Sequence, residues 1–398
     1  MQKCKPSLLT LCMLMSFPVV GAVIFTPALA RLVNDFGIST GLSQMTVAVY
    51  LGGYALGQLP YSWLCARYGH KSAIYIGIGI FIFGSALCAW APTFGWLMVG
   101  RAVMALGAAV GLMMTFTLVS QFYSVDEARS IFAYTAISMA IAPGLANLVG
   151  GLLTGFLGWK SCFYFLILYA LLLGTSAKRL PNIENREDRA VFSLRSYVSA
   201  LINPRFLTLT FASALTTALV YVFASTAPLT TIYLLEVAPQ VYGFVSLIPF
   251  IGTVSGCFVS AALAEKLSAH KAIGLGVGVS FTGALLKWLL VQVFGLHVWT
   301  LFAPMPLIYF GLPFVYSNGA AIGLSLIEDK TVGSSIFCVG NIGLSLLGVL
   351  MMGWMGISSI TRLPIVFLGM MALMATLFVV NLFLGKGDAA ATQPVSES

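Results

Sequence analysis

The sequence carries very little charge, and acidic residues are the scarcest part of it. Only 8% of its 398 residues are Asp, Glu, Lys or Arg, and twelve of these are acidic. Soluble domains carry about a quarter charged residues, so this composition argues against one. Cysteine is sparse as well. The seven cysteines are scattered without a Cys-x-x-Cys pair, which favours buried thiols over a zinc site or a disulfide framework.

Motifs for ATP binding and for hydrolytic chemistry are also missing. The sequence contains no Walker A motif, no Gly-x-Ser-x-Gly and no His-Glu-x-x-His. The spaced glycines Gly274, Gly276 and Gly278 lie inside an apolar segment, which indicates helix packing and not a dinucleotide loop. We therefore expect a protein that is not an enzyme and that holds no cofactor and no metal ion.

Long apolar runs dominate the chain instead. Hydrophobic residues make up 59% of it, and runs long enough to cross a bilayer as a helix, about 20 residues, recur throughout. We expect an all-α membrane protein with twelve transmembrane helices. The expected spans are 8–33, 43–66, 72–91, 94–122, 129–156, 160–177, 205–235, 241–264, 271–294, 298–327, 333–355 and 363–384.

The net charge of +8 reflects membrane topology and not nucleic-acid binding. With the N-terminus inside, the cytoplasmic loops and tails take all but five of the twenty Lys and Arg residues. The outer side takes Arg31, Lys160 and Arg362, while Arg101 and Lys287 fall within spans. The positive-inside rule then predicts that both termini lie in the cytoplasm.

The spans divide into two sets of six that resemble each other. His70-Lys71 opens the third span and His270-Lys271 opens the ninth, and spaced glycines follow both pairs. Six spans per set give both sets the same orientation, as in a parallel repeat. We expect an N-terminal six-helix half at 1–177, a cytoplasmic linker at 178–204, a C-terminal half at 205–385 and a disordered tail at 386–398.

The fifth span carries an unusual pattern of Pro and Gly. Proline bends a helix, and glycines leave a face that a neighbouring helix can approach closely. The residues of this pattern are Pro143, Gly144, Gly150 and Gly151, followed by Gly158, Trp159, Lys160 and Phe163. The pattern resembles the fifth-helix antiporter motif of major facilitator transporters, especially their Bcr/CflA drug-resistance branch.

The loop after the second span resembles the conserved cytoplasmic loop of that family, which binds its helices together by ion pairs. Arg67, Gly69 and Lys71 match the pattern, whereas Ser62 and Ala66 stand where the family has Gly and Asp. The resemblance implies that Arg67, Gly69 and Lys71 take part in conformational switching.

Two cations lie within spans. Arg101 matches the arginine of the family's fourth-helix motif. It either ties carbonyl groups of the first span or faces a wet cavity as a partner for substrate or protons, and we assign it to the cavity. Lys287 lies near the outer end of its span beside Trp288, so we expect its side chain to extend to the membrane surface.

Polar side chains at helical spacing predict the lining of a central cavity, although such stripes also serve as packing contacts between helices. The candidates besides Arg101 are Tyr50, Tyr54, Gln58, Tyr134, Asn147, Tyr221, Tyr316, Asn318 and Asn341.

No acidic residue falls within an expected span. Val23 stands where the family has an Asp in the first span. A proton-coupled exporter usually holds a buried carboxylate whose pKa its surroundings can shift. The remaining candidates for proton coupling are Asp35 and Glu236, at the outer ends of the first and seventh spans.

The resemblance implies the major facilitator fold, a location in the bacterial inner membrane and secondary transport by alternating access. The expected function is efflux of drugs or small amphipathic compounds, with proton entry as a candidate driving force. The alternatives are transport of a polar or anionic metabolite, such as a carboxylate siderophore, and a receptor of the same fold that does not transport. We expect a monomer in lipid whose partners are a small-molecule substrate and, if coupled, protons, with no nucleic acid.

Overall fold

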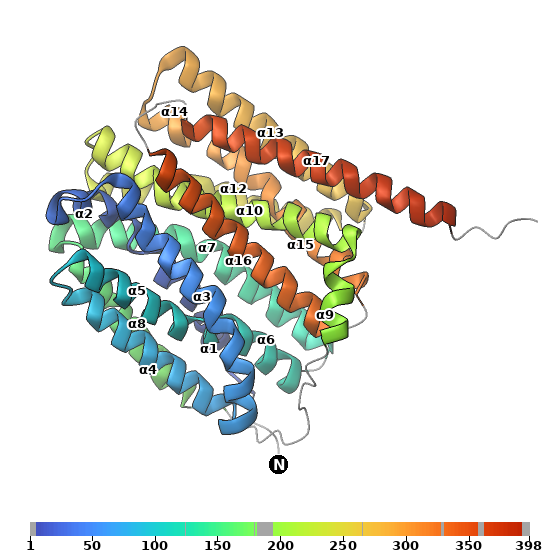
Figure 1. Cartoon of the computed structure of the whole chain (residues 1–398), viewed down its shortest axis with the longest axis horizontal. Coiled ribbons are helices and arrows are strands. Elements are labelled where there is room, and N and C mark those ends of the chain that lie inside the picture. Colours follow the sequence, from blue (N-terminus) through green and yellow to red (C-terminus); the bar gives the residue numbers. More distant parts are fainter. Residues whose placement is uncertain are drawn as a thin grey trace, which may run out of the picture. The chain divides into compact units, whose positions relative to one another are not determined.

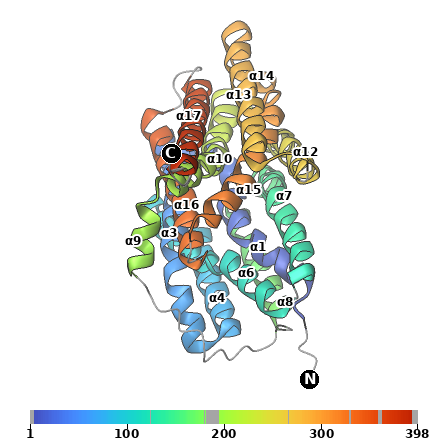
Figure 2. The same ribbon diagram turned by 90° about the vertical axis from the view of Figure 1, so that its right-hand side faces the viewer.

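The computed structural model describes residues 5–123, 125–178, 180, 194–264, 266–327, 330–356 and 362–391, and every regular element in these ranges is helical (Figures 1 and 2). The helices of the N-terminal part are α1 (Leu8–Val23), η1 (Thr26–Ala28), α2 (Leu29–Phe36), α3 (Thr40–Tyr68), α4 (His70–Ala89), α5 (Phe94–Ala108), α6 (Val110–Phe122), α7 (Val125–Leu157) and α8 (Lys160–Ala177). The remaining helices are α9 (Leu194–Leu201), α10 (Pro204–Pro228), η2 (Leu229–Leu234), α11 (Pro239–Val245), α12 (Ile248–Leu263), α13 (Ala269–Phe294), α14 (Val298–Phe302), α15 (Met305–Ser325), α16 (Lys330–Met355) and α17 (Arg362–Ala391).

The all-helical membrane fold that the sequence predicts is confirmed. Eleven segments of the described residues are long and apolar enough to cross a membrane. The expected span that is not among these eleven is 43–66, and it lies in α3. This helix has 29 residues and is therefore about 44 Å long at 1.5 Å per residue. Helices are the expected solution because lipid offers no partner for backbone polar groups.

Several expected spans are interrupted, and three of the breaks lie at prolines. Pro27 lies in the short η1 segment between α1 and α2, Pro249 stands at the start of α12, and Pro304 precedes α15. Proline lacks the N–H group that continues a helix, so the chain turns at these points without leaving the span. Pro143, in contrast, lies inside α7, which continues on both sides of it.

The chain forms two compact units. The first unit contains residues 1–190, 221–250 and 346–359, and the second contains 191–220, 251–345 and 360–398. The first unit thus holds the first six spans together with one end of α10, all of α11 and the last part of α16. The two halves expected from the sequence, 1–177 and 205–385, remain a prediction.

Within the first unit, α4 and α5 pack with almost no side chain between them. A Cβ atom on Gly84 would overlap the backbone nitrogen of Met104, and one on Gly107 would overlap the carbonyl oxygen of Gly77. Small residues let backbones approach in this way, which is how helices associate where water does not drive them together.

The second unit repeats this packing between α13 and α15. A Cβ on Gly283 would lie 2.8 Å from the backbone nitrogen of Ile308, and one on Gly311 would overlap the carbonyl oxygen of Gly276. The same two kinds of contact therefore recur, in the same arrangement along each helix pair. This supports the internal repeat that the His-Lys pairs and spaced glycines predict.

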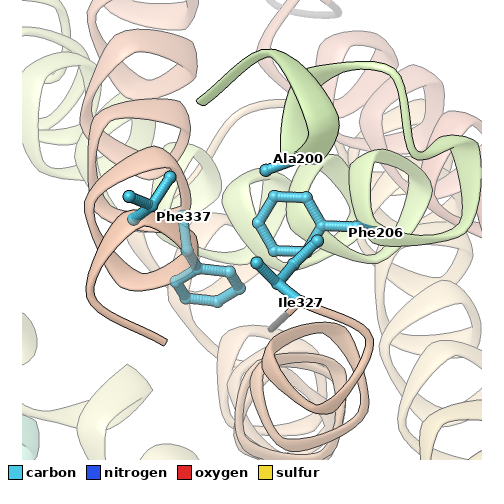
Figure 3. Packing of buried hydrophobic residues seen from close by; sticks show 5 residues of the cluster. Ala200, Phe206, Ile327 and Phe337 are labelled. Carbon is cyan, nitrogen blue, oxygen red and sulfur yellow. The ribbon is translucent and has the colours of Figure 1, made fainter. Parts of the chain in front are cut away.

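A cluster of apolar side chains closes one end of the second unit (Figure 3). Ala200 of α9 and Phe206 of α10 pack with Ile327, which follows α15, and with Val332 and Phe337 of α16. The predicted linker 178–204 therefore contains the helix α9, while 181–193 lie outside the described residues. At the other terminus α17 continues to Ala391, and the disorder expected for the tail at 386–398 remains a prediction.

The glycine contacts predict a matched pair of stability effects. We expect Gly84→Ala and Gly283→Ala each to destabilise the protein by about 1–3 kcal/mol, because the added methyl group forces two packed backbones apart. Gly79→Ala and Gly278→Ala are the controls, since a Cβ at either position meets no atom within 4 Å. Thermal unfolding of the purified protein in detergent measures all four. Equal midpoints for the two sets would contradict the close packing.

Candidate functional site

Arg101 joins three helices of the first unit. Its side chain is 0% exposed and donates three hydrogen bonds to backbone carbonyls. Nη1 donates to Gly21 O at 2.8 Å, Nη2 to Ala22 O at 3.2 Å and Nε to Thr46 O at 3.2 Å. The guanidinium carbon also lies 4.4 Å from the centroid of the Tyr50 ring. Arg101 of α5 is thereby bound to both α1 and α3.

The end of α1 explains why a cation is stabilised at this point. The helix ends at Val23, so Gly21 and Ala22 belong to its last turn. The carbonyls of a last turn lack partners within the helix and carry partial negative charge. Arg101 supplies the missing donors and the favourable charge. Of the two roles considered from the sequence, the contacts are those of a tie to the first span, and the cavity role remains a prediction without an observed contact.

The polar stripe of α3 is largely engaged in packing. Tyr50 is 0% exposed and its hydroxyl donates to Pro18 O at 2.8 Å. Tyr54 is also buried. Gln58 differs, because it is half-buried and its Nε2 has no hydrogen-bond partner among the described residues. Gln58 is thus the member of this stripe best able to donate to a ligand.

The candidates of the second unit lie on α15 and α16, and Asn341 among them bonds to α10. Thr217 donates to Asn341 Oδ1 at 2.9 Å, and Asn341 Nδ2 donates to Phe337 O at 2.8 Å. Asn318 Nδ2 donates within its own helix to Phe314 O. Tyr316 is 38% exposed and its ring meets the Phe337 ring edge-on at 5.7 Å.

The other predicted cavity residues of the first unit lie in different surroundings. Asn147 is buried and its Oδ1 accepts a hydrogen bond from Thr26 at 2.8 Å. Tyr221 is nearly buried, whereas Tyr134 is 53% exposed. Asn147 therefore joins α7 to η1, which is a packing role.

The Pro-Gly pattern of α7 forms a surface for close contact. A Cβ on Gly150 would overlap the carbonyl group of Ile24, and one on Gly151 would lie 2.9 Å from Gly243 Cα in α11. A Cβ on Gly144 would meet the ring of Phe250 at 2.8 Å. The glycine face that the sequence predicts is thus occupied by the end of α1 and by α11 and α12. The bend at Pro143 remains a prediction.

The loop between α3 and α4 contacts a backbone carbonyl at the end of α8. Gly69 has φ = 82°, a conformation that favours glycine, and it turns the chain between the helices. Lys71 Nζ donates to Lys178 O at 2.8 Å, at the C-terminal end of α8. Arg67 is exposed above the ring of Tyr68. The loop therefore contacts α8 through Lys71.

Both candidate coupling carboxylates are exposed. Asp35 Oδ2 accepts a hydrogen bond from Trp159 Nε1 at 2.8 Å, and the Trp159 ring packs against Phe25 and Phe36. Glu236 has φ = 54°, which is uncommon for a residue with a side chain, and follows the π-helical segment η2. The Trp of the fifth-span pattern thus anchors the end of α2.

The prediction that Lys287 reaches the membrane surface is wrong. Lys287 is 0% exposed, with Nζ 3.3 Å from Met305 Sδ and 4.4 Å from the centroid of the Phe367 ring. It continues the buried stripe of α13 that includes Ser280 and Gly283. This stripe turns Lys287 toward α15 and α17, where the aromatic ring offers a favourable contact to the cation. The helical spacing of that stripe was the signal that the sequence offered.

Two contacts at the predicted outer helix ends escaped the sequence reasoning. Gln44 of α3 is 1% exposed and donates from Nε2 to Thr226 Oγ1 of α10 at 3.3 Å. One turn away, a Cβ on Gly41 would overlap the carbonyl oxygen of Gly353 in α16. The sequence signal for the first contact was a glutamine, Gln44, just inside an apolar span. No feature of the sequence predicts the contact between Gly41 and Gly353.

The contacts of Arg101 predict a structural penalty on its replacement. Each buried carbonyl left without a donor costs about 1–3 kcal/mol, so we expect Arg101→Ala to lower the unfolding midpoint strongly. Arg101→Lys should lower it less, since one ammonium group cannot serve carbonyls of two helices as the planar guanidinium does. Arg67→Lys, at an exposed arginine, is the control. Transport lost at an unchanged midpoint in Arg101→Lys would instead indicate contact with substrate.

Comparison with known proteins agrees with this architecture. The sequence profile described as Major Facilitator Superfamily matches residues 9–345. Multidrug resistance protein D of Escherichia coli (strain K12) is 23% identical, over 86% of this chain and 87% of that protein. A chloramphenicol resistance protein of Pseudomonas aeruginosa is 26% identical, over 83% and 80%. The bicyclomycin resistance protein homolog of Haemophilus influenzae is 21% identical, over 84% and 87%.

Solved structures show the same fold at low sequence identity. A nucleoside transporter superposes with a TM-score of 0.73 at 15% identity, covering 94% of this chain and 98% of that one. The xylose transporter XylE from E. coli gives 0.71 at 13% identity, covering 95% and 96%. The helical architecture and the profile that spans most of its length together establish that the chain belongs to the Major Facilitator Superfamily of membrane transporters.

Proposed function

We propose that the protein exports drugs or similar small amphipathic compounds from a bacterial cytoplasm by alternating access. Family membership makes it a multi-pass membrane transporter of small molecules. The names of its relatives, among them multidrug, bicyclomycin and chloramphenicol resistance proteins, support drugs as the cargo and efflux as the direction. In this proposal it works as a monomer in lipid and catalyses no reaction.

The observation that carries the proposal is a set of contacts within the first unit. Gln44 with Thr226, Gly41 with Gly353, and the glycine face of α7 with α11 each join a residue of the first six spans to one of the last six. Alternating access opens one side of the membrane at a time, so contacts of this kind must break when their side opens. We assign them to a closed outer gate.

The basic residues give the proposed orientation. They concentrate in loops and tails that lie on the same side as both termini, which places that side in the cytoplasm. Thr226, Gly41 and Gly353 then lie at the outer ends of α10, α3 and α16. The inner membrane is the compartment that this distribution and the bacterial relatives support.

Proton entry is the proposed driving force, with Asp35 and Glu236 as the candidate carriers. Both are exposed at predicted outer helix ends, so either can exchange protons with the outside. We expect Asp35→Asn or Glu236→Gln to abolish the response of transport to a pH gradient in proteoliposomes, because neither amide can bind and release the proton. A full response in both variants would exclude these two carboxylates.

Export itself is tested in bacterial cells that lack their own major exporters. We expect expression of the chain to lower the steady-state accumulation of radiolabelled chloramphenicol several-fold and to raise the concentration that inhibits growth. Collapse of the proton gradient should restore accumulation if protons drive export. Unchanged accumulation of chloramphenicol and of other drugs, with the protein present in the membrane, would overturn the proposal.

A substitution at the proposed outer gate should change the conformational equilibrium of the transporter. Gly41→Ala places a methyl group against the Gly353 carbonyl, so we expect it to prevent closure on that side and to reduce export at least about tenfold. Gly353→Ala is the matched control, because its Cβ would lie no closer than 3.3 Å to its neighbours and requires only slight adjustment. Export at the wild-type rate in folded Gly41→Ala would remove this contact from the gate.

A further inference from the structure

We infer that the substrate carries no net charge and is recognised through hydrogen bonds. This inference rests on the proposed export function and narrows its substrate class. It excludes cationic compounds, and it excludes the anionic metabolites that two intramembrane cations suggest. Three properties of the chain carry it: the contacts of the cations, the placement of the acids, and a neutral polar group in α3.

The first property concerns Arg101, the cation expected to attract anions. Its guanidinium is 0% exposed and donates to Gly21 O, Ala22 O and Thr46 O, with the Tyr50 ring beside it. To reach a ligand it would have to leave the three carbonyls that accept its hydrogen bonds. The backbone thus holds the side chain in place, and a fully buried guanidinium cannot touch an anion without moving.

The charge of Lys287 is also inaccessible to a ligand. It is 0% exposed, and Met305 and Phe367 lie against its ammonium group. These contacts face α15 and α17, which pack directly against α13. Neither intramembrane cation therefore presents its charge on an accessible surface.

The second property is the position of the acids. None of the twelve acidic residues lies within a predicted span. The two whose side chains the structure describes, Asp35 and Glu236, are exposed beyond the ends of α1 and η2. A cation moving through the membrane interior would have no opposite charge to replace its hydration, which is a severe penalty in low dielectric. An uncharged molecule avoids that penalty.

The third property is a neutral polar group in α3. Gln58 is half-buried, and its Nε2 has no hydrogen-bond partner among the described residues. Buried polar atoms normally find a partner, so this amide is available to a ligand or to water. It can donate to a carbonyl or hydroxyl oxygen of the substrate, and it brings no charge to offset that of an ion.

Matched probes test the inference on the full-length protein in proteoliposomes at neutral pH. The probes are chloramphenicol, which is uncharged, ethidium, which is a permanent cation, and naphthalene-2-sulfonate, which is a permanent anion. We expect transport of chloramphenicol, with ethidium and the sulfonate at least about tenfold slower, because each ion lacks a counter-charge. Neither ion should compete with chloramphenicol for binding to the wild-type chain.

A single substitution reverses the expected preference. Gln58→Glu keeps the shape of the side chain and adds a carboxylate, so we expect measurable ethidium transport and weaker chloramphenicol transport. Gln292→Glu, at an exposed position of α13, is the control and should leave the preference unchanged. A folded Gln58→Glu with wild-type selectivity would remove Gln58 from the site.

The outcomes of these experiments distinguish a failure of the charge inference from a failure of the proposed export function. Transport of ethidium or of the sulfonate at the rate of chloramphenicol overturns the charge inference while leaving the exporter in place. Failure of all three probes, and of further drugs, to move overturns the proposed export function. The competition assay decides the charge question even if Gln58→Glu does not fold, since it uses the wild-type protein.

Discussion

The structure depends on one constraint, which is that polar backbone groups in lipid must find partners within the protein. Helices satisfy most of these groups, and the exceptions lie at helix ends and breaks. The carbonyls at the end of α1 are such an exception, and Arg101 supplies their donors. Lys71 acts in a similar way at the end of α8, where it donates to the carbonyl of Lys178. Charged side chains in this protein thus complete the backbone as well as setting topology.

Close approach of helices is the second element of the architecture. Gly77 and Gly107 between α4 and α5, and Gly150 on α7, bring backbones together where a single methyl group would not fit. Contacts made at this distance are sensitive to small displacements of the helices. The same kind of contact occurs within the α4–α5 pair and between α7 and α11, so the proposed gate and the α4–α5 interface share one packing principle.

The positions of the spans were predictable because a helix that crosses a bilayer needs about 20 apolar residues, which local composition reveals. The contact partner of a polar residue was not predictable, since it depends on how each helix is rotated about its axis. Arg101 therefore allowed two interpretations, and the environment of Lys287 was predicted wrongly from its nearness to a helix end. Similarly, Gln58 and Tyr50 share one stripe of α3, yet only Tyr50 finds a backbone acceptor. The sequence identified the candidate polar residues. Tertiary packing determined which of them bond to other parts of the protein and which have polar atoms without such a bond.

The paired glycines of α4–α5 and α13–α15 also relate the surroundings of the two intramembrane cations. Lys287 stands four residues after Gly283, as Cys88 stands four residues after Gly84. Met305 stands six residues before Gly311, as Arg101 stands six residues before Gly107. Arg101 lies beside Cys88, and Lys287 lies beside Met305. Each repeat therefore has one cation and one sulfur-containing neighbour at the same junction, with the charge on α5 in the first repeat and on α13 in the second.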